Sequence, residues 1–168
     1  ATAASASRSH RRRIQRSILA AAMKTQQHPK LAGLMAAAHI DHFTPAEVLT
    51  LGSQHDENGL NQLPPLKIVH QIMPTLALAE ALRREIKQPI AIISGYRSDA
   101  HNKAIGGARG SMHRQFRALD IRCTKVTPDT LHAILLRWRN AGQWRGGLGL
   151  YPSFVHIDDR SQNTDWRG

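Results

Sequence analysis

Hydrophobic residues recur at helical spacing in three parts of the chain. Over about residues 66–87, seven apolar side chains follow the 3.6-residue period, which predicts a long amphipathic helix. A second helix is predicted to start at Thr127 and Pro128 and to end at Gly142, with four large apolar side chains on one face. The same spacing over residues 10–25 indicates a helix near the start of the chain.

The segment HFTPAEVL contains the start of a further helix. Thr44 is a favourable N-cap, Pro45 suits the first helical position, and Glu47 can complete a capping box. After this helix, the Asn, Gly and Pro content of residues 57–65 predicts a loop.

Short apolar segments predict four strands in the second half of the chain. These segments are residues 90–94, 117–123, 146–151 and 154–159. A loop with three glycines, residues 105–111, precedes the second strand. The order of elements predicts an α+β fold, in which a small and mostly antiparallel sheet is backed by helices.

Length and composition fit a single globular domain. The 168 residues are sufficient for a core, and 41% hydrophobic with 21% charged residues is typical of globular proteins. Cys123 is the only cysteine, which excludes an intrachain disulfide and a cysteine-rich zinc cluster. No apolar run approaches the roughly 18 residues of a transmembrane helix.

Positive charge is concentrated at the start of the chain. Seven of the eleven net positive charges lie in residues 1–40, which contain no acid, and this leaves +4 for residues 41–168. We therefore predict a basic, partly helical N-terminal arm followed by one domain. Such an arm attracts nucleic acid, an anionic membrane or an acidic cell-wall polymer, and a solvated tail is the alternative. The apolar patch from Ile18 to Met23 is shorter than the roughly 7–15 residues of a signal-peptide core, so no export signal is evident.

Histidine and aspartate occur at strand positions where a core residue is expected. Alternation places Phe154, His156 and Asp158 on one face of the last predicted strand, where a buried His and Asp need polar partners. His113 and Asp120 are seven residues apart. On a helix they would be about 10.5 Å apart along the axis, too far for one metal ion.

A loop position for His113 and a strand position for Asp120 would allow the two side chains to meet. With His156 they form a set of two imidazoles and one carboxylate, as in hydrolytic zinc sites that keep a fourth position for water. Spacing alone leaves an ordinary buried histidine as an equal alternative, because the chain contains ten histidines.

Four blocks of the sequence resemble the M15-type zinc peptidases. They are SGYRS (94–98), GGARGSMHRQFRALDI (106–121), GGLGLYPSFVHID (146–158) and DWRG (165–168). DHFTPAEV, near Asp41, is similar to an early segment of one subgroup, that of bacterial cell-wall enzymes and phage lysins. The family includes D-Ala-D-Ala carboxypeptidases and murein endopeptidases, and the resemblance covers about residues 40–168.

The resemblance implies roles for individual residues. His113, Asp120 and His156 match the zinc ligands of the family, so one Zn²⁺ is expected on the sheet of a zinc peptidase-like domain. Arg97 matches an arginine that faces the substrate and can bind a carbonyl or carboxylate oxygen. Its alternative role is a salt bridge with Asp99 or Asp158.

Two positions differ from the family pattern. Phe116 stands four residues before the ligand aspartate, where the family usually has a glycine, so either the loop is rebuilt or Phe116 forms a wall of the substrate groove. Ser153 stands where several relatives carry the acid that acts as general base. The nearest acid is Asp158, which either activates the zinc-bound water or orients His156.

Further candidates for contact with the substrate are Tyr96, Ser111 and Tyr151, together with Phe116. Each tyrosine fits the edge of the core equally well, and Ser111 fits a plain loop residue.

The resemblance predicts a zinc metallopeptidase that hydrolyses peptide bonds of bacterial peptidoglycan with a zinc-activated water. It would be a carboxypeptidase or an endopeptidase of the periplasm, the cell wall or a phage, with its basic arm on an anionic wall polymer. Nucleic acid is the least favoured partner, because DNA binding leaves the His–Asp strand unexplained. The alternative is a catalytically inactive cell-wall-binding or structural module of the same fold, which the departures at Phe116 and Ser153 favour.

Overall fold

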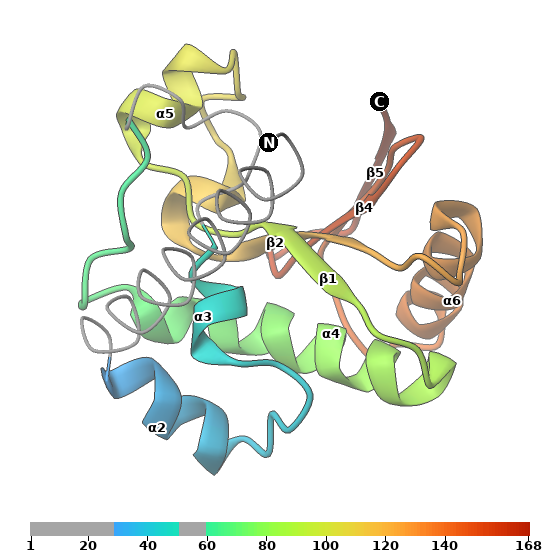
Figure 1. Cartoon of the computed structure of the whole chain (residues 1–168). Helices are drawn as coiled ribbons and strands as arrows, with labels where there is room; N and C mark the ends of the chain where they lie inside the picture. The colour runs from blue at the N-terminus through green and yellow to red at the C-terminus, as the bar shows by residue number, and fades with distance from the viewer. Residues whose placement is uncertain (1–28, 51–59) are drawn as a thin grey trace, which may run out of the picture.

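The computed structural model describes residues 29–50 and 60–168. The helix predicted over residues 10–25 and the first part of the loop predicted over 57–65 lie outside the described residues. The described elements (Figure 1) are, in chain order, α2 (Pro29–Ala37), α3 (Pro45–Val48), the 3₁₀ helix η1 (Val69–Ile72), α4 (Met73–Ile86), β1 (Ala91–Ser94), α5 (Asp99–Ala104), the 3₁₀ helix η2 (Met112–Gln115), β2 (Ala118–Arg122), α6 (Pro128–Asn140), β3 (Gly147–Leu150), β4 (Val155–Asp158) and β5 (Thr164–Arg167).

Five strands form one sheet in the order β1-β2-β4-β3-β5. The pairs β1–β2, β2–β4 and β3–β4 are antiparallel, whereas β3 and β5 are parallel. This confirms a single α+β domain with a mostly antiparallel sheet. The edge strand β5 was not predicted, because its four residues TDWR are polar or partly exposed and show no apolar alternation.

The long helix predicted over residues 66–87 is divided in two. The 3₁₀ turn η1 precedes α4, and Pro74 occupies the first turn of α4. Proline has no N–H to donate to the carbonyl four residues earlier, so the α-helical ladder starts anew there. The helix ends at Ile86, where Lys87 adopts a left-handed conformation and donates its N–H to the carbonyl of Arg83.

Two other predicted helix starts are confirmed by their caps. Thr44 and Glu47 form a reciprocal capping box, with N···O distances of 3.2 and 2.7 Å. Thr127 caps α6 by accepting a hydrogen bond from the N–H of Thr130. The six-residue helix α5 was not predicted, because it is too short to display a hydrophobic period.

The hydrophobic core is formed by buried side chains of the strands and of α4, which runs below β1 and β2 in Figure 1. Alternation directs Leu119 and Ile121 of β2, and the leucines of the Gly-Leu-Gly-Leu strand β3, into this core. Two residues of α2, Leu31 and Met35, are also buried in it, although they belong to the predicted arm over residues 1–40. The division of the chain at residue 40 stays a prediction.

Among the described helices, none is both long and apolar enough to cross a membrane.

Candidate metal centre

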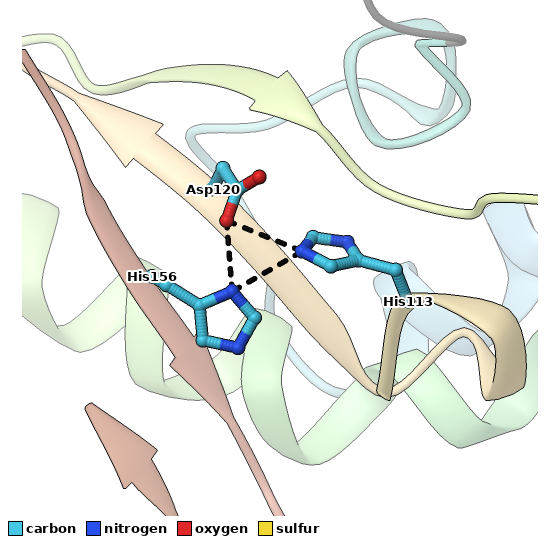
Figure 2. A group of neighbouring side chains, drawn as sticks. All are labelled: His113, Asp120 and His156. Atoms are coloured by element: carbon cyan, nitrogen blue, oxygen red, sulfur yellow. Dashed lines mark hydrogen bonds and ion pairs between the residues drawn. The ribbon is translucent and has the colours of Figure 1, made fainter. Parts of the chain in front are cut away.

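One cross-strand row of the sheet carries two of the predicted ligands. Asp120 of β2 is paired with His156 of β4, which is paired with Gly149 of β3, and Gly149 is paired in turn with Trp166 of β5. Directly paired residues share a face of the sheet, and this row projects from the face opposite the core. His113 reaches the same place from η2, immediately before β2 (Figure 2).

The three ligand atoms converge on one point. Nδ1 of His156 lies 2.8 Å from Oδ1 of Asp120, Nε2 of His113 lies 3.2 Å from the same oxygen, and the two nitrogens are 3.1 Å apart. In a tetrahedral zinc site with bonds of about 2.0–2.1 Å, neighbouring ligand atoms are about 3.3 Å apart. All three side chains are buried. Their spacing therefore fits a single small divalent ion.

In each imidazole, the nitrogen that faces away from the cluster carries the hydrogen, and the nitrogen that faces the cluster carries the lone pair. Nδ1 of His113 donates to the carbonyl oxygen of Gly95 at 2.6 Å, so in the neutral ring Nε2 is the free acceptor. Nε2 of His156 donates to Oδ2 of Asp158 at 2.9 Å, which leaves the lone pair on Nδ1. Two lone pairs and a carboxylate oxygen within 3.2 Å repel one another unless a proton or a metal ion lies between them.

Both carboxylates of the centre are anionic at neutral pH. Burial alone would raise the pKa of Asp120, but His113 and His156 lower it far below its usual range. Burial would likewise raise the pKa of Asp158, but hydrogen bonds from His156 and Arg160 lower it. Desolvation lowers the pKa of His113, which favours the neutral, metal-binding ring. Burial acts the same way on His156, but its hydrogen bonds to Asp120 and Asp158 raise its pKa overall.

Arg97 lies beside the ligand carboxylate and lines the cleft described below. Its Nη2 donates to Oδ2 of Asp120 at 2.6 Å, and its Nε donates to Oγ of Ser94 at 3.1 Å. Asp120 therefore presents one oxygen to the histidines and the other to Arg97. The alternative salt bridges of Arg97 are not formed, because Arg114 pairs with Asp99 and Arg160 pairs with Asp158.

A cleft of about 670 Å³ opens over the ligand row. Its lining comprises the three ligands, two arginines (Arg97 and Arg160), the segment Gly106, Gly107, Ala108, Gly110, Ser111 and Met112, and three aromatic residues (Tyr151, Phe154 and Trp166). Tyr151 is stacked on Phe154, with ring centroids 4.3 Å apart. The predicted ligands thus lie in an open cleft that is lined by a glycine-rich segment and three aromatic residues.

The other predicted substrate contacts divide into two groups. Ser111 and Tyr151 line the cleft. Tyr96 is half-buried, and its ring packs nearly at a right angle against the ring of Phe116, with centroids 6.1 Å apart.

The structure corrects the expectation that Phe116 forms a wall of the groove. Its side chain is 0% exposed and belongs to the hydrophobic core. The backbone has φ of 55° and ψ of 45°, the left-handed conformation that the family's glycine would adopt easily. This left-handed residue forms the turn from η2 into β2 and directs the phenyl ring inward.

Asp158 does not line the cleft. Its side chain is fully buried, and its oxygens accept hydrogen bonds from Nε2 of His156, the N–H of Gly147 and the guanidinium of Arg160. Among the described residues that line the cleft, Asp120 is the only acid. Of the two predicted roles for Asp158, this geometry fits the orientation of His156.

Outside the glycine-rich segment, three residues of the cleft were not predicted as site residues: Phe154, Arg160 and Trp166. Alternation already placed Phe154 on the face of His156, and Trp166 belongs to the DWRG block that resembles the family. Arg160 gave no comparable signal, since it follows the last predicted strand and its partner is visible only in the fold.

The chain matches the model of a known protein family. A family model described as Peptidase M15 matches residues 41–158, which include the three ligands and Arg97. No curated protein matches the chain. Peptidases of this family are typically metal-dependent, in agreement with the His–Asp–His cluster. Because the match covers well over half of the sequence, the chain belongs to the M15 family of peptidases.

Proposed function

We propose that this protein is a zinc-dependent peptidase that hydrolyses peptide bonds of bacterial peptidoglycan, in stem peptides or cross-links. The observation that carries the proposal is the convergence of two imidazole nitrogens and one carboxylate oxygen within 3.2 Å at the floor of an open cleft. Three protein ligands leave a fourth tetrahedral position accessible from that cleft. Similarity to the cell-wall subgroup of the family supports peptidoglycan as the substrate.

The residues of the cleft have distinct tasks in this proposal. His113, Asp120 and His156 hold the ion, which when bound polarises the scissile carbonyl and lowers the pKa of water to about 7. Arg97 uses two donors on Asp120 and Ser94, and its remaining N–H groups are available for a carbonyl or carboxylate oxygen of the substrate.

The proposed site of action is outside the cytoplasm, in the periplasm or cell wall or on a phage particle. The basic residues of the first 40 positions would hold the enzyme on an anionic wall polymer.

The test is mass spectrometry of purified peptidoglycan fragments before and after incubation with the full chain. We expect cleavage products with new amine ends, their loss on chelation and their return on addition of zinc. His113→Ala should abolish cleavage, whereas His70→Ala, at an exposed position away from the cleft, should leave it unchanged. Absence of cleavage by a zinc-loaded wild-type chain would contradict the proposal, and the masses also identify the bond that is cut.

A second candidate function is binding to the cell wall without catalysis. It is favoured by Ser153, which stands where relatives carry an acid, and by the lack of a second acid among the described lining residues. A protein of this kind would bind zinc and sediment with murein, but it would release no new amine ends in the same experiment.

A further inference from the structure

Besides the other two candidate ligands, His156 contacts two residues that are not ligands, Asp158 and Trp166. We propose that Arg160 and Trp166 are positioning residues: Arg160 acts through Asp158 and Trp166 acts by packing on the ring, and together they hold the His156 imidazole with Nδ1 directed at the metal. Both lie beyond the residues that the family model matches. The proposal deepens the proposed function and rests on its metal centre.

Arg160 fixes the orientation of the Asp158 carboxylate. The guanidinium binds the carboxylate with two prongs, Nη2 to Oδ2 at 2.6 Å and Nε to Oδ1 at 2.9 Å. The backbone N–H groups of Arg160 and Gly147 also donate to Oδ1, at 3.1 and 2.9 Å. These donors set the plane of a fully buried carboxylate, so that Oδ2 faces Nε2 of His156 at 2.9 Å.

Trp166 packs against both His156 and Arg160. Its ring lies 5.0 Å from the His156 ring, and the guanidinium of Arg160 lies 5.1 Å from the indole centroid, within cation–π range. The indole N–H donates to the hydroxyl of Tyr151 at 3.0 Å, which fixes the orientation of the ring. Trp166 therefore restrains the imidazole of His156 by direct contact, and it also restrains the guanidinium of Arg160 by covering one of its sides.

Strand β3 provides the space for this arrangement. A Cβ on Gly149 would lie 2.5 Å from the indole nitrogen of Trp166. A Cβ on Gly147 would lie 2.5 Å from Oδ2 of Asp158 and 2.8 Å from Nε of Arg160. All three distances are too short for real contacts, so a side chain at either glycine would displace Trp166 or the Asp158–Arg160 pair, while the leucines of the same strand fill the core.

The position of the His156 ring should determine how tightly the centre binds its metal. Because Asp158 accepts a hydrogen bond from Nε2 of His156, the ring carries its hydrogen on Nε2 and keeps Nδ1 as the ligand atom. Loss of such an outer partner typically weakens metal binding by about 10–100-fold.

The experiment is a zinc titration of the metal-free full chain in competition with a chromophoric chelator. We expect Arg160→Gln to weaken zinc binding by about 10–100-fold. The matched control is Arg117→Gln, because Arg117 binds the next acid, Asp159, at 2.7 Å but touches no ligand. It should leave the zinc affinity unchanged.

A spectroscopic readout separates positioning from general stability. In the zinc-loaded wild type, long-range ¹H–¹⁵N spectra should show the His156 hydrogen on Nε2 and zinc on Nδ1, and Arg160→Gln should broaden or lose that Nε2–H signal. Gly149→Ala, which displaces the indole and removes no polar group, should also weaken zinc binding. If Arg160→Gln does not fold, Arg160→Lys takes its place, since lysine keeps the charge but not the two-pronged contact.

Zinc affinity equal to wild type in a folded Arg160 variant would overturn the positioning role. A wild-type chain that binds no zinc would instead overturn the metal centre itself, so the two failures are distinguishable.

Discussion

At Phe116 a large side chain occupies a left-handed backbone position, with φ of 55°. This conformation costs a non-glycine residue about 1–2 kcal/mol. Burial of the phenyl ring contributes about 1.5–3 kcal/mol and offsets that cost. The departure from the family's glycine is therefore a packing feature and does not obstruct the cleft.

Substitutions at Phe116 should separate these two effects. Phe116→Ala keeps the strained backbone and loses the ring, so we expect a loss of about 3–5 kcal/mol in the free energy of unfolding. Phe116→Gly loses the same ring but relieves the backbone, so it should be about 1 kcal/mol more stable than the alanine variant. Urea denaturation of both proteins measures the difference. Equal stability of the two variants would show that the backbone is not strained.

The guanidinium of Arg97 is the second single group for which we predict a measurable effect, here on cleavage. Arg97→Lys keeps the positive charge but removes the planar set of donors beside Asp120. We expect kcat/KM for cleavage of a muropeptide to fall by about 100-fold. Zinc content should remain one ion per chain, which distinguishes this variant from the loss of a ligand. A variant with unchanged kcat/KM would exclude a role of Arg97 in the transition state.

At the scale of elements, Glu80 joins α4 to the segment between α2 and α3. The carboxylate of this buried residue accepts hydrogen bonds from the backbone N–H groups of Asp41 and His42, from the His42 ring at 2.6 Å, and from Arg84. Burial alone would raise the pKa of Glu80, but its hydrogen bonds with His42 and Asp41 lower it below the ordinary value of 4.5. Glu80 therefore ties α4 to the connection between α2 and α3 through a carboxylate that is ionised at neutral pH.

Glu80→Gln should lower the free energy of unfolding by about 1–3 kcal/mol at pH 7. Because the pKa of Glu80 is lower in the folded than in the unfolded chain, its contribution is complete above the unfolded pKa and is lost as the pH falls through the folded value. The difference between wild type and variant should therefore shrink in acid. Urea denaturation at pH 7 and at acidic pH tests this. Glu85→Gln, at an exposed position of the same helix, is the control and should change stability by less than about 0.5 kcal/mol.

At the scale of the whole molecule, the candidate metal centre joins segments that are distant in the sequence. Its ligands come from η2, β2 and β4, and Arg160 and Trp166 connect the centre to β5. An ion that binds only the folded chain stabilises it by mass action, by about 2.7 kcal/mol when its free concentration is 100 times Kd.

Zinc should accordingly raise the melting temperature of the metal-free protein by about 5–10 °C at that concentration. Differential scanning calorimetry with and without zinc measures the shift. His113→Ala should show little or no shift, because one of the three ligands is missing. An equal shift in wild type and His113→Ala would place the stabilising ion elsewhere.

Much of the fold and of the candidate site was predictable because the relevant signals are local. Alternation assigned His156 and Asp158 to one face of β4 and Val155 and Ile157 to the other, and the structure confirms this. The threonine caps of α3 and α6 depend on residues within one helical turn. The division of the predicted 66–87 helix was missed because the apolar period continues through Pro74, and the strand β5 was missed because four residues without apolar alternation give a weak signal.

The sequence by itself determined the class of the fold, and its resemblance to a family indicated the family and the candidate ligand set, because the residue types within each matching block express them. Only the tertiary structure decided which oxygen of Asp120 faces the histidines, which nitrogen of each imidazole is free, and where the ring of Phe116 points. It also decided that Asp158 is a buried partner of Arg160. The physical reason is that these properties are contacts between strands and loops far apart in the chain, and each depends on the register in which the sheet brings them together.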